Sequence, residues 1–502
     1  MNNNIKELLK NKYTILLISI LSFAFIIRLY YMIKYMDQAV WWDAADYLST
    51  AKYFAGHAFQ DFHIDYRRPF LLPLIWSVFF RLGASEFIIN LTELIFSVFG
   101  VYLTYLVGKE LFNKETGLIA AFLMSIFWSH LFWTPRFMVD IPSATLLLAS
   151  FYFFWKGYVK KEKKSYVYLW GLFLSLAVFT RASTVVAIIP FGLYILIKDK
   201  LNFLKNKQLW LAFLIFIIII SPFVIYTQIK TGDAFKDITG IGTDRFSKVI
   251  DASGRFNTLK EFSLQMPAYL KLPFFLLTLI GLTIFINLFL SLDLIFKNKE
   301  ESSNNLLLLF LWVFGMYIIL SMLTGVEERY LMSIFPMIFI LTAQGTLISY
   351  NFLKNQLKNT KHISKILIFI FILIFVWGTV SQLSLADSLI KSKAESYYQV
   401  KEAGLWLKGN TPEESSIISA SRFQNIYYSE RSTYGFTQNE SDFKDYIKEK
   451  NVKYVIISVF ESGFTPQWTF EYPQKHPELL KPAQVYTDPN NNPLLIIYEV
   501  TN

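Results

Sequence analysis

The chain has 502 residues, of which 54% are hydrophobic, 18% aromatic and 17% charged, and its formal net charge is +10. Apolar runs of about 20 residues recur along it and match the thickness of a bilayer core, which excludes a water-soluble globular protein. The absence of cysteine excludes disulfide frameworks, thiolate catalysis and cysteine metal sites, and the five histidines lack metal-ligand spacing.

About eleven apolar runs predict the membrane-spanning helices of an α-helical polytopic membrane protein. They lie near residues 13–33, 87–108, 115–134, 138–156, 167–181, 182–197, 209–229, 267–292, 305–323, 330–350 and 366–384. The first run is longer than a signal-peptide core, carries Arg28 and lacks a small-residue cleavage site, so we expect a retained helix. Residues 1–389 are therefore predicted to form one transmembrane domain.

Lysine and arginine are distributed differently along the chain. If the amino terminus is cytoplasmic, every inner loop is rich in lysine, as the positive-inside rule requires. We therefore expect a multi-pass protein of the plasma or inner membrane, with its amino terminus in the cytoplasm and its tail outside. The net charge then reflects topology rather than a nucleic-acid partner. All arginines fall on the outer side, where planar guanidinium groups are suited to binding phosphate oxygens in pairs.

Four predicted outer segments carry most of the candidate functional residues. These segments are residues 34–86, 133–140, 230–266 and 324–330. The first holds Trp41-Trp42-Asp43 and an apolar piece, residues 70–82, that is too short to span and is expected to be an interfacial helix.

Composition changes after the last apolar run, and residues 390–502 predict a small α/β domain outside the membrane. The patterns favour helices at 397–408 and 442–450 and strands at 416–420, 453–459 and 494–500.

Asp43 and Asp46 have two interpretations. Both acids can neutralise the amino terminus of the helix that begins there. Asp43 also follows two interfacial tryptophans and is close in sequence to a group of arginines, where an acid is functionally conspicuous. We therefore expect a functional role for Asp43, whereas the capping role is favoured for Asp46.

The phosphate of a donor is predicted to bind basic residues on the outer side. The candidates are Arg68, Arg136, Arg329, Lys52 and Arg67. The arginines before Pro69 can also snorkel at the interface, and Arg136 can pair with Asp140 four residues later. Glu328 and Arg329 can be simply a charged turn. Asp140 and Glu328 are predicted to bind the acceptor or support the site.

The order of these elements resembles the integral-membrane glycosyltransferases of the C-type (GT-C) fold, in the branch of protein O-mannosyltransferases and lipid A aminoarabinose transferases. The resemblance covers roughly residues 10–350. The matching segments are Trp42-Asp43, Asp46-Tyr47-Leu48, Arg68 to Pro73, Ala84 to Phe87, Arg136 to Pro142, Thr180-Arg181, Glu328 to Leu331 and Phe335-Pro336. That branch usually shows an Asp-Glu pair in the first loop, whereas Ala44 follows Asp43 here.

The resemblance implies transfer of a sugar from a polyprenyl-phosphate carrier to a protein, lipid or glycan acceptor at the outer membrane face, with inversion at the anomeric carbon. Asp43 would be the catalytic base that activates the acceptor hydroxyl, with Asp46 and Tyr47 in acceptor binding or support. The arginines would stabilise the leaving phosphate. The motifs require no cofactor, and a divalent metal stays open.

Two other functions compete with this interpretation. A transporter or flippase of lipid-linked sugars should carry ionisable residues along a path through its spans, and such charge is nearly absent here. Enzymes that transfer whole oligosaccharides to asparagine carry a Trp-Trp-Asp motif in the carboxy-terminal domain, whereas here it lies in the first loop.

Overall fold

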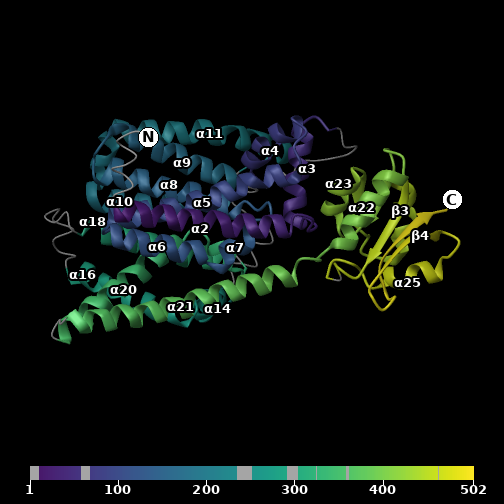
Figure 1. Ribbon diagram of the computed structural model, residues 1–502. Helices are drawn as coiled ribbons and strands as arrows, with labels where there is room; N and C mark the ends of the chain where they lie inside the picture. The colour runs from purple at the N-terminus through teal and green to yellow at the C-terminus, as the bar shows by residue number, and fades with distance from the viewer. Residues whose placement is uncertain are drawn as a thin grey trace. The chain divides into compact units, whose positions relative to one another are not determined.

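The computed structural model describes residues 11–57, 68–234, 252–290, 303–323, 325–357, 361–461 and 463–501. Two compact units make up the chain, and each is described by itself (Figure 1). The helical unit comprises Met1–Lys34, Tyr66–Leu71 and Asn90–Ile390, and the mixed unit comprises Tyr35–Asp65, Leu72–Ile89 and Lys391–Asn502. Arg67, one of the predicted phosphate ligands, lies outside the described residues.

The helical unit contains most of the long apolar helices. Its first half holds α2 (Lys12–Lys34), α5 (Glu86–Leu111), α6 (Lys114–Ile126), α7 (Trp128–Trp133), α8 (Asp140–Phe154), α9 (Lys164–Thr180), α10 (Ile188–Asp199) and α11 (Lys207–Thr231). Its second half holds α14 (Ala252–Leu270), α15 (Leu272–Leu282), α16 (Ile284–Leu290), α18 (Asn304–Phe310), α19 (Met316–Leu323), α20 (Phe335–Gln356) and α21 (Lys361–Ser392). Short helical turns η1 to η5 join them, at Trp155–Val159, Ala182–Ala187, Lys200–Lys205, Leu311–Gly315 and Glu328–Leu331.

The polytopic helical class is confirmed. Among the described residues, eight helices are long and apolar enough to cross a membrane by length and composition. The other three predicted spans are also helical but shorter. The run at 115–134 is interrupted at Phe127, the run at 138–156 ends in a π-helical turn, and the run at 167–181 forms the 17-residue helix α9.

Small residues allow the closest helix contacts in this unit. Helices α15 and α20 cross where Gly281 faces Leu341 and Gly345 faces Leu277. A Cβ atom added to Gly345 would lie 1.8 Å from the Leu277 carbonyl oxygen, so only glycine fits there. Close backbone approach at small residues is a main source of packing energy between membrane helices, because lipid tails offer no hydrophobic penalty to drive association.

One buried side chain makes hydrogen bonds to the backbone at two helix breaks in this unit. Phe127 is non-helical and separates α6 from α7, and Lys271, with φ 65°, separates α14 from α15. The breaks free the Trp128 amide and the carbonyls at residues 269 and 270. Gln382 of α21, 1% exposed, accepts from the Trp128 N–H at 3.1 Å and donates to both carbonyls, at 3.0 and 2.9 Å. Freed backbone groups need protein partners where water is absent.

Replacing this amide should therefore weaken the helical unit. We expect Gln382→Leu to lower the free energy of unfolding by about 2 kcal/mol, since it removes the side-chain partner of the Trp128 N–H and the Leu270 carbonyl. The Tyr269 carbonyl keeps its bond from the Trp128 indole at 3.0 Å. The measurement is the thermal unfolding midpoint of the full-length protein in detergent. Ser381→Ala is the matched control, because the Ser381 hydroxyl is exposed and bonds only within its own helix. Equal midpoints for both variants would show that the breaks are stabilised by other contacts.

The mixed unit contains a five-stranded sheet with strand order β2-β1-β3-β5-β4. The strands are β1 (Ser416–Ser419), β2 (Ser432–Tyr434), β3 (Val452–Ser458), β4 (Leu480–Thr487) and β5 (Pro493–Val500). The β1 strand pairs in parallel with β2 and β3, whereas β5 pairs antiparallel with β3 and β4. The helices are α3 (Trp42–Phe54), α4 (Leu71–Arg81), α22 (Tyr398–Asn410), α23 (Arg422–Ser429), α24 (Phe443–Glu449) and α25 (Trp468–Lys475).

Alternation along the central strands builds a core on each face of this sheet. Ile418 packs with Phe443 of α24 on one face, and Ile417 packs with Leu407 of α22 on the other. The predicted strands at 416–420, 453–459 and 494–500 correspond to β1, β3 and β5, which supply these alternating positions. The small carboxy-terminal α/β domain is thus confirmed as a fold.

Candidate active site

The predicted base lies in the first turn of α3, in the mixed unit. The helix begins at Trp42 after Trp41, which occupies the N-cap position without a side-chain cap hydrogen bond. Neither acid is therefore the N-cap residue. Asp43 is partly exposed, whereas Asp46 and Tyr47 are buried, at 3% and 7% exposure. The structure thus separates the two acids into an accessible carboxylate and an enclosed one.

Aromatic contacts fix the start of α3 within the mixed unit. The Trp42 ring lies 5.1 Å from the Phe423 ring and 5.5 Å from the Phe464 ring, between centroids. The hydroxyl of Tyr428 accepts from the Val40 N–H at 2.8 Å. Asp43 therefore projects from a segment held on both sides, which suits a group that needs a fixed position.

Lys52, predicted to bind the donor, makes its described contacts at the other end of α3. Its ammonium pairs with Glu430 at 2.8 Å, donates to the Tyr427 carbonyl at 3.2 Å and lies 4.2 Å from the centre of the Tyr427 ring. Lys408 pairs with the second Glu430 oxygen at 2.8 Å. Burial lowers the pKa of Lys52, although the hydrogen bond to Glu430 and the charge of that carboxylate act to raise it. Burial alone would raise the pKa of Glu430, but hydrogen bonds from the two lysines hold it below its ordinary value.

The Glu430 contact should contribute stability that depends on pH. A depressed carboxyl pKa stabilises the folded state above the ordinary value of about 4.3, and this contribution is lost as the pH falls through the folded pKa. We expect Glu430→Gln to cost about 1 kcal/mol at pH 7 and to reduce the hydrogen-exchange protection of α3 roughly fivefold. Glu413→Gln, on the exposed surface, is the control. A difference from the wild type that stays unchanged as the pH falls from 7 through the ordinary carboxyl pKa of about 4.3 and below would contradict a charge-dependent contact.

In the helical unit, the predicted Arg68-Pro69-Phe70 segment is anchored by its phenylalanine. The Phe70 ring lies 5.2 Å from Phe179 of α9 and 5.9 Å from Phe223 of α11. Pro69 is buried and Arg68 is partly buried. Because Phe179 is two residues before Arg181, the Arg68 segment is attached at the end of α9 that also carries Arg181.

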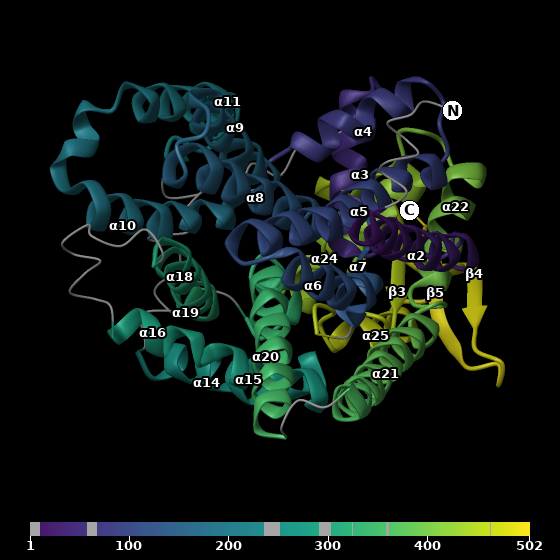
Figure 2. The ribbon, with the colours of Figure 1, turned by 60° about the vertical axis from the view of Figure 1, so that its left-hand side comes forward.

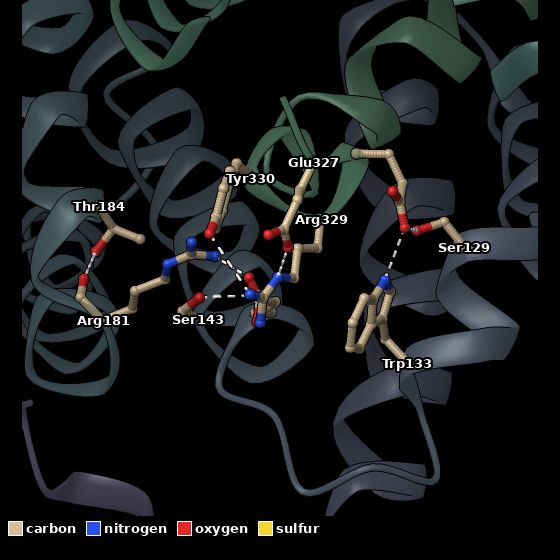
Figure 3. A network of polar contacts seen from close by, with 10 residues as sticks. Ser129, Trp133, Ser143, Arg181, Thr184, Glu327, Arg329 and Tyr330 are labelled. Carbon is tan, nitrogen blue, oxygen red and sulfur yellow. Dashed lines mark hydrogen bonds and ion pairs between the residues drawn. The ribbon is translucent and has the colours of Figure 1, made fainter. Parts of the chain in front are cut away.

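The centre of the candidate site is the Asp140 carboxylate at the start of α8. It is 2% exposed and accepts a hydrogen bond from the Arg181 guanidinium, while Arg329 lies 4.0 Å from its second oxygen (Figure 3). Arg329 also donates to Glu327 at 2.5 Å. The Arg181 guanidinium lies 5.1 Å from the centre of the Tyr330 ring. One buried acid thus gathers two arginines from different helical elements.

Arg136 lies in the turn between α7 and α8 and is 5% exposed. Its guanidinium donates to the Phe132 carbonyl and lies 3.7 Å from the centre of the Phe132 ring. Burial lowers the pKa of Arg136 to about 9, so the group remains protonated at neutral pH. This turn therefore adds a third positive charge to the part of the chain next to Asp140.

Glu328, predicted to bind the acceptor or support the site, is held by α7. Its carboxylate accepts from Trp133 Nε1 at 2.9 Å and from the Ser129 hydroxyl at 3.3 Å (Figure 3). The Arg329 guanidinium lies 5.0 Å from the centre of the Trp133 ring. The turn at residues 325–330 is thus more than a charged turn, since Glu328 and Arg329 both contact α7.

The arginine pair borders a small polar cavity. Its volume is about 10 Å³, room for little more than one water molecule. Ser143, Thr184, Tyr330 and the two arginines are among its lining residues.

Two residues near Asp140 were not singled out as site residues by the sequence analysis. Arg181 was one of the outer-face arginines, but nothing in the sequence shows that it pairs with Asp140. Glu93 of α5 is fully buried, interacts electrostatically with Asp140 and has no hydrogen-bond partner among the described residues. An isolated acid in an apolar span is itself a signal of function.

The described residues contain no group of three or more histidine, aspartate or glutamate side chains that could hold a metal ion. No step of the proposed reaction depends on a metal ion.

Comparisons with known proteins agree with the resemblance seen in the sequence. A family model described as dolichyl-phosphate-mannose-protein mannosyltransferase matches residues 67–226. Among proteins of curated function, none matches the chain in sequence.

Solved structures resemble the whole chain. ArnT from Cupriavidus metallidurans bound to undecaprenyl phosphate superposes with a TM-score of 0.63 and 8% identity, over 96% of this chain and 97% of that one. The Archaeoglobus fulgidus oligosaccharyltransferase tethered with an acceptor peptide superposes with a TM-score of 0.59 and 15% identity, over 98% of this chain and 74% of that one. AglB from the same organism, in complex with an inhibitory peptide and a dolichol-phosphate, superposes with a TM-score of 0.57 and 15% identity. That match covers 97% of this chain and 74% of AglB. The GT-C fold is thereby confirmed.

Proposed function

We propose that this chain is an inverting membrane glycosyltransferase that moves a sugar from a polyprenyl-phosphate carrier to a protein, lipid or glycan acceptor at the outer membrane face. The observation that carries the proposal is the buried Asp140 carboxylate with Arg181 and Arg329, in a fold shared with such enzymes. The family match over residues 67–226 includes Arg68, Arg136 and Arg181. The lysine distribution supports a cytoplasmic amino terminus and an external position for residues 390–502.

The arginines suit the leaving group of this reaction. As the bond between sugar and phosphate breaks, negative charge grows on the departing phosphate oxygen, so guanidinium donors fixed at that position stabilise the transition state more than the ground state. Asp140 fixes its two partners before any donor binds, which lowers the cost of ordering them. Two similar structures hold undecaprenyl phosphate and a dolichol-phosphate, which supports a lipid phosphate as the donor's leaving group.

Asp43 suits the other half of the reaction. An acceptor hydroxyl needs a base within hydrogen-bond reach, and a partly exposed acid on a fixed segment is better placed for this than the enclosed Asp46. The neighbouring position, where the family branch usually has glutamate, holds Ala44 with no exposed surface. A second carboxylate there would be buried in the mixed unit, which explains why alanine is tolerated. The acceptor proton therefore goes to Asp43 alone in this proposal.

The transporter alternative has little support in the spans. Such a protein needs ionisable groups along a path through the membrane. Arg28 of α2 is buried, but it donates to the Ser97 hydroxyl at 2.6 Å and to the Ser125 carbonyl at 2.9 Å. These bonds tie three helices together and leave Arg28 as a structural contact rather than part of a pathway.

The base assignment is tested by Asp43→Asn. Asparagine keeps the size of the side chain but cannot accept the acceptor proton, so we expect transfer to fall about 100-fold or more. The measurement is sugar transfer by purified protein supplied with a panel of radiolabelled undecaprenyl-phosphate sugars. Asp46→Asn is the matched control on the same helix and should be milder. Near-normal transfer by well-folded Asp43→Asn would refute the assignment.

The phosphate assignment is tested by Arg136→Ala and Arg136→Lys. We expect alanine to slow the release of undecaprenyl phosphate from the active donor about 100-fold, the usual scale for one transition-state donor. Lysine should restore only part of the rate, because a point charge cannot make two parallel hydrogen bonds. Arg81→Ala removes another outer-side arginine, whose described bond is to the Phe54 carbonyl, and should leave the rate unchanged. If Arg136→Ala behaves like Arg81→Ala, the phosphate binds elsewhere.

A further inference from the structure

An apolar pocket lies between α9, α10 and α11 of the helical unit, away from the residues discussed above. Its volume is about 370 Å³, and nearly all of its surface is apolar. Six of its lining side chains are Trp170, Leu174, Phe191, Ile195, Phe213 and Phe216. The pocket has the size and character of a site for a hydrocarbon chain.

The pocket exists because α9 and α11 pack closely against each other, whereas α10 does not pack closely against them. Helix α9 packs tightly on α11 where Gly171 meets Ala212, since a Cβ atom on Gly171 would lie 2.6 Å from the Ala212 carbonyl oxygen. Helix α10 packs instead towards α18 and η4, and Figure 2 shows it running apart from α11. An added Cβ atom on Gly192 of α10 would meet nothing within 4 Å.

One end of the pocket lies at the lysine-bearing ends of these helices. Phe203 of η3 lines the pocket, and Lys200 and Lys205 flank it in the same turn. Lys207 follows at the start of α11. These three lysines have no ion-pair partner among the described residues, and the nearby Asp199 accepts from the Tyr158 hydroxyl at 2.6 Å.

The opposite end of the pocket reaches towards the middle of the spans. Its α10 lining extends from Ile195 back to Ile188, about 10 Å at the rise of an α-helix. Half of a bilayer core is about 15 Å thick, so this depth fits the acyl chain of a lipid in one leaflet. The exposed Trp210 donates to the Leu204 carbonyl at 2.8 Å and holds η3 against α11 at the level where tryptophan favours the membrane interface.

We infer that this pocket binds one acyl chain of an anionic phospholipid, whose headgroup contacts Lys200, Lys205 and Lys207. Hydrocarbon alone gives no preference for a site over the surrounding bilayer, because lipid tails are as apolar as the lining. The three lysines supply the preference, since basic residues beside a pocket between spans attract anionic headgroups. The donor phosphate is assigned to the arginines, so this site is a separate one and does not depend on the proposed function.

The test is binding of dioleoylphosphatidylglycerol, compared with dioleoylphosphatidylcholine, to the full-length protein by native mass spectrometry. We expect one phosphatidylglycerol to bind at least tenfold more tightly than phosphatidylcholine. Gly192→Leu should abolish that binding, because leucine fills open space without a clash and is a better helix former than glycine. Gly409→Leu makes the same change in α22, at another open position, and should bind like the wild type.

The headgroup contact is tested by the double variant K200Q/K205Q, which should lose at least tenfold in affinity for phosphatidylglycerol. K354Q/K365Q removes two other lysines predicted to lie on the same membrane face and should have no effect. Crosslinking of wild-type protein with phosphatidylglycerol carrying a diazirine in its acyl chain should label residues 188–216, which tests the site even if a variant fails to fold. Unchanged binding by Gly192→Leu, equal effects of the two double variants, labelling elsewhere, or displacement of the lipid by equimolar undecaprenyl phosphate would each overturn the inference.

Discussion

The buried Asp140 carboxylate is the interaction on which the candidate site depends. Two arginines with little exposed surface need a negative charge to offset the cost of leaving water, and Asp140 supplies it from the first turn of α8. It also determines where the guanidinium groups lie, since Arg181 follows α9 and Arg329 lies in η5. Because the carboxylate is nearly inaccessible, a phosphate cannot displace it by simple exchange in solvent. The arginines can therefore keep their geometry when a ligand binds beside them.

The positions of the charged residues could be predicted from the sequence, but their pairing could not. Segregation of arginine from lysine is a property of composition along the chain, and it singled out Arg68, Arg136 and Arg329. The partners of Asp140 are distant in sequence, Arg181 by 41 residues, so only the packing of α8, α9 and η5 brings them together. A local rule instead suggested Arg136, four residues from Asp140, as the ion-pair partner. The placement of Asp43 in the first turn of a helix was predictable because the pattern there is local.

The same distinction applies to the fold. Hydropathy located the apolar runs, and alternation located β1, β3 and β5. The breaks at Phe127 and Lys271 carry no signal in hydropathy, because a non-helical residue inside an apolar run remains apolar or lies at its edge. Two strands were not predicted from the sequence: β4, whose residues are mostly exposed and include Pro482, and β2, which has only three residues. The helix breaks depend on hydrogen bonds from Gln382, β4 depends on pairing with β5, and β2 depends on pairing with β1. All of these are contacts between segments that are distant in the sequence.

The chemistry of the two basic residue types explains why arginine is absent from the predicted inner loops, where lysine is abundant. A lysine ammonium is a point charge on a flexible stem, adequate for attraction to anionic lipid headgroups that differ in position and orientation. A guanidinium has a rigid fork of donors, and its cost of burial is repaid only where acceptors are fixed, as at Asp140 or at a phosphate in a defined reaction geometry. The structure reflects that difference. Among the described residues, Lys200, Lys205 and Lys207 have no ion-pair partner, whereas two arginines are enclosed beside Asp140. The proposed site for a lipid headgroup therefore uses lysines, and the proposed site for a lipid phosphate uses arginines.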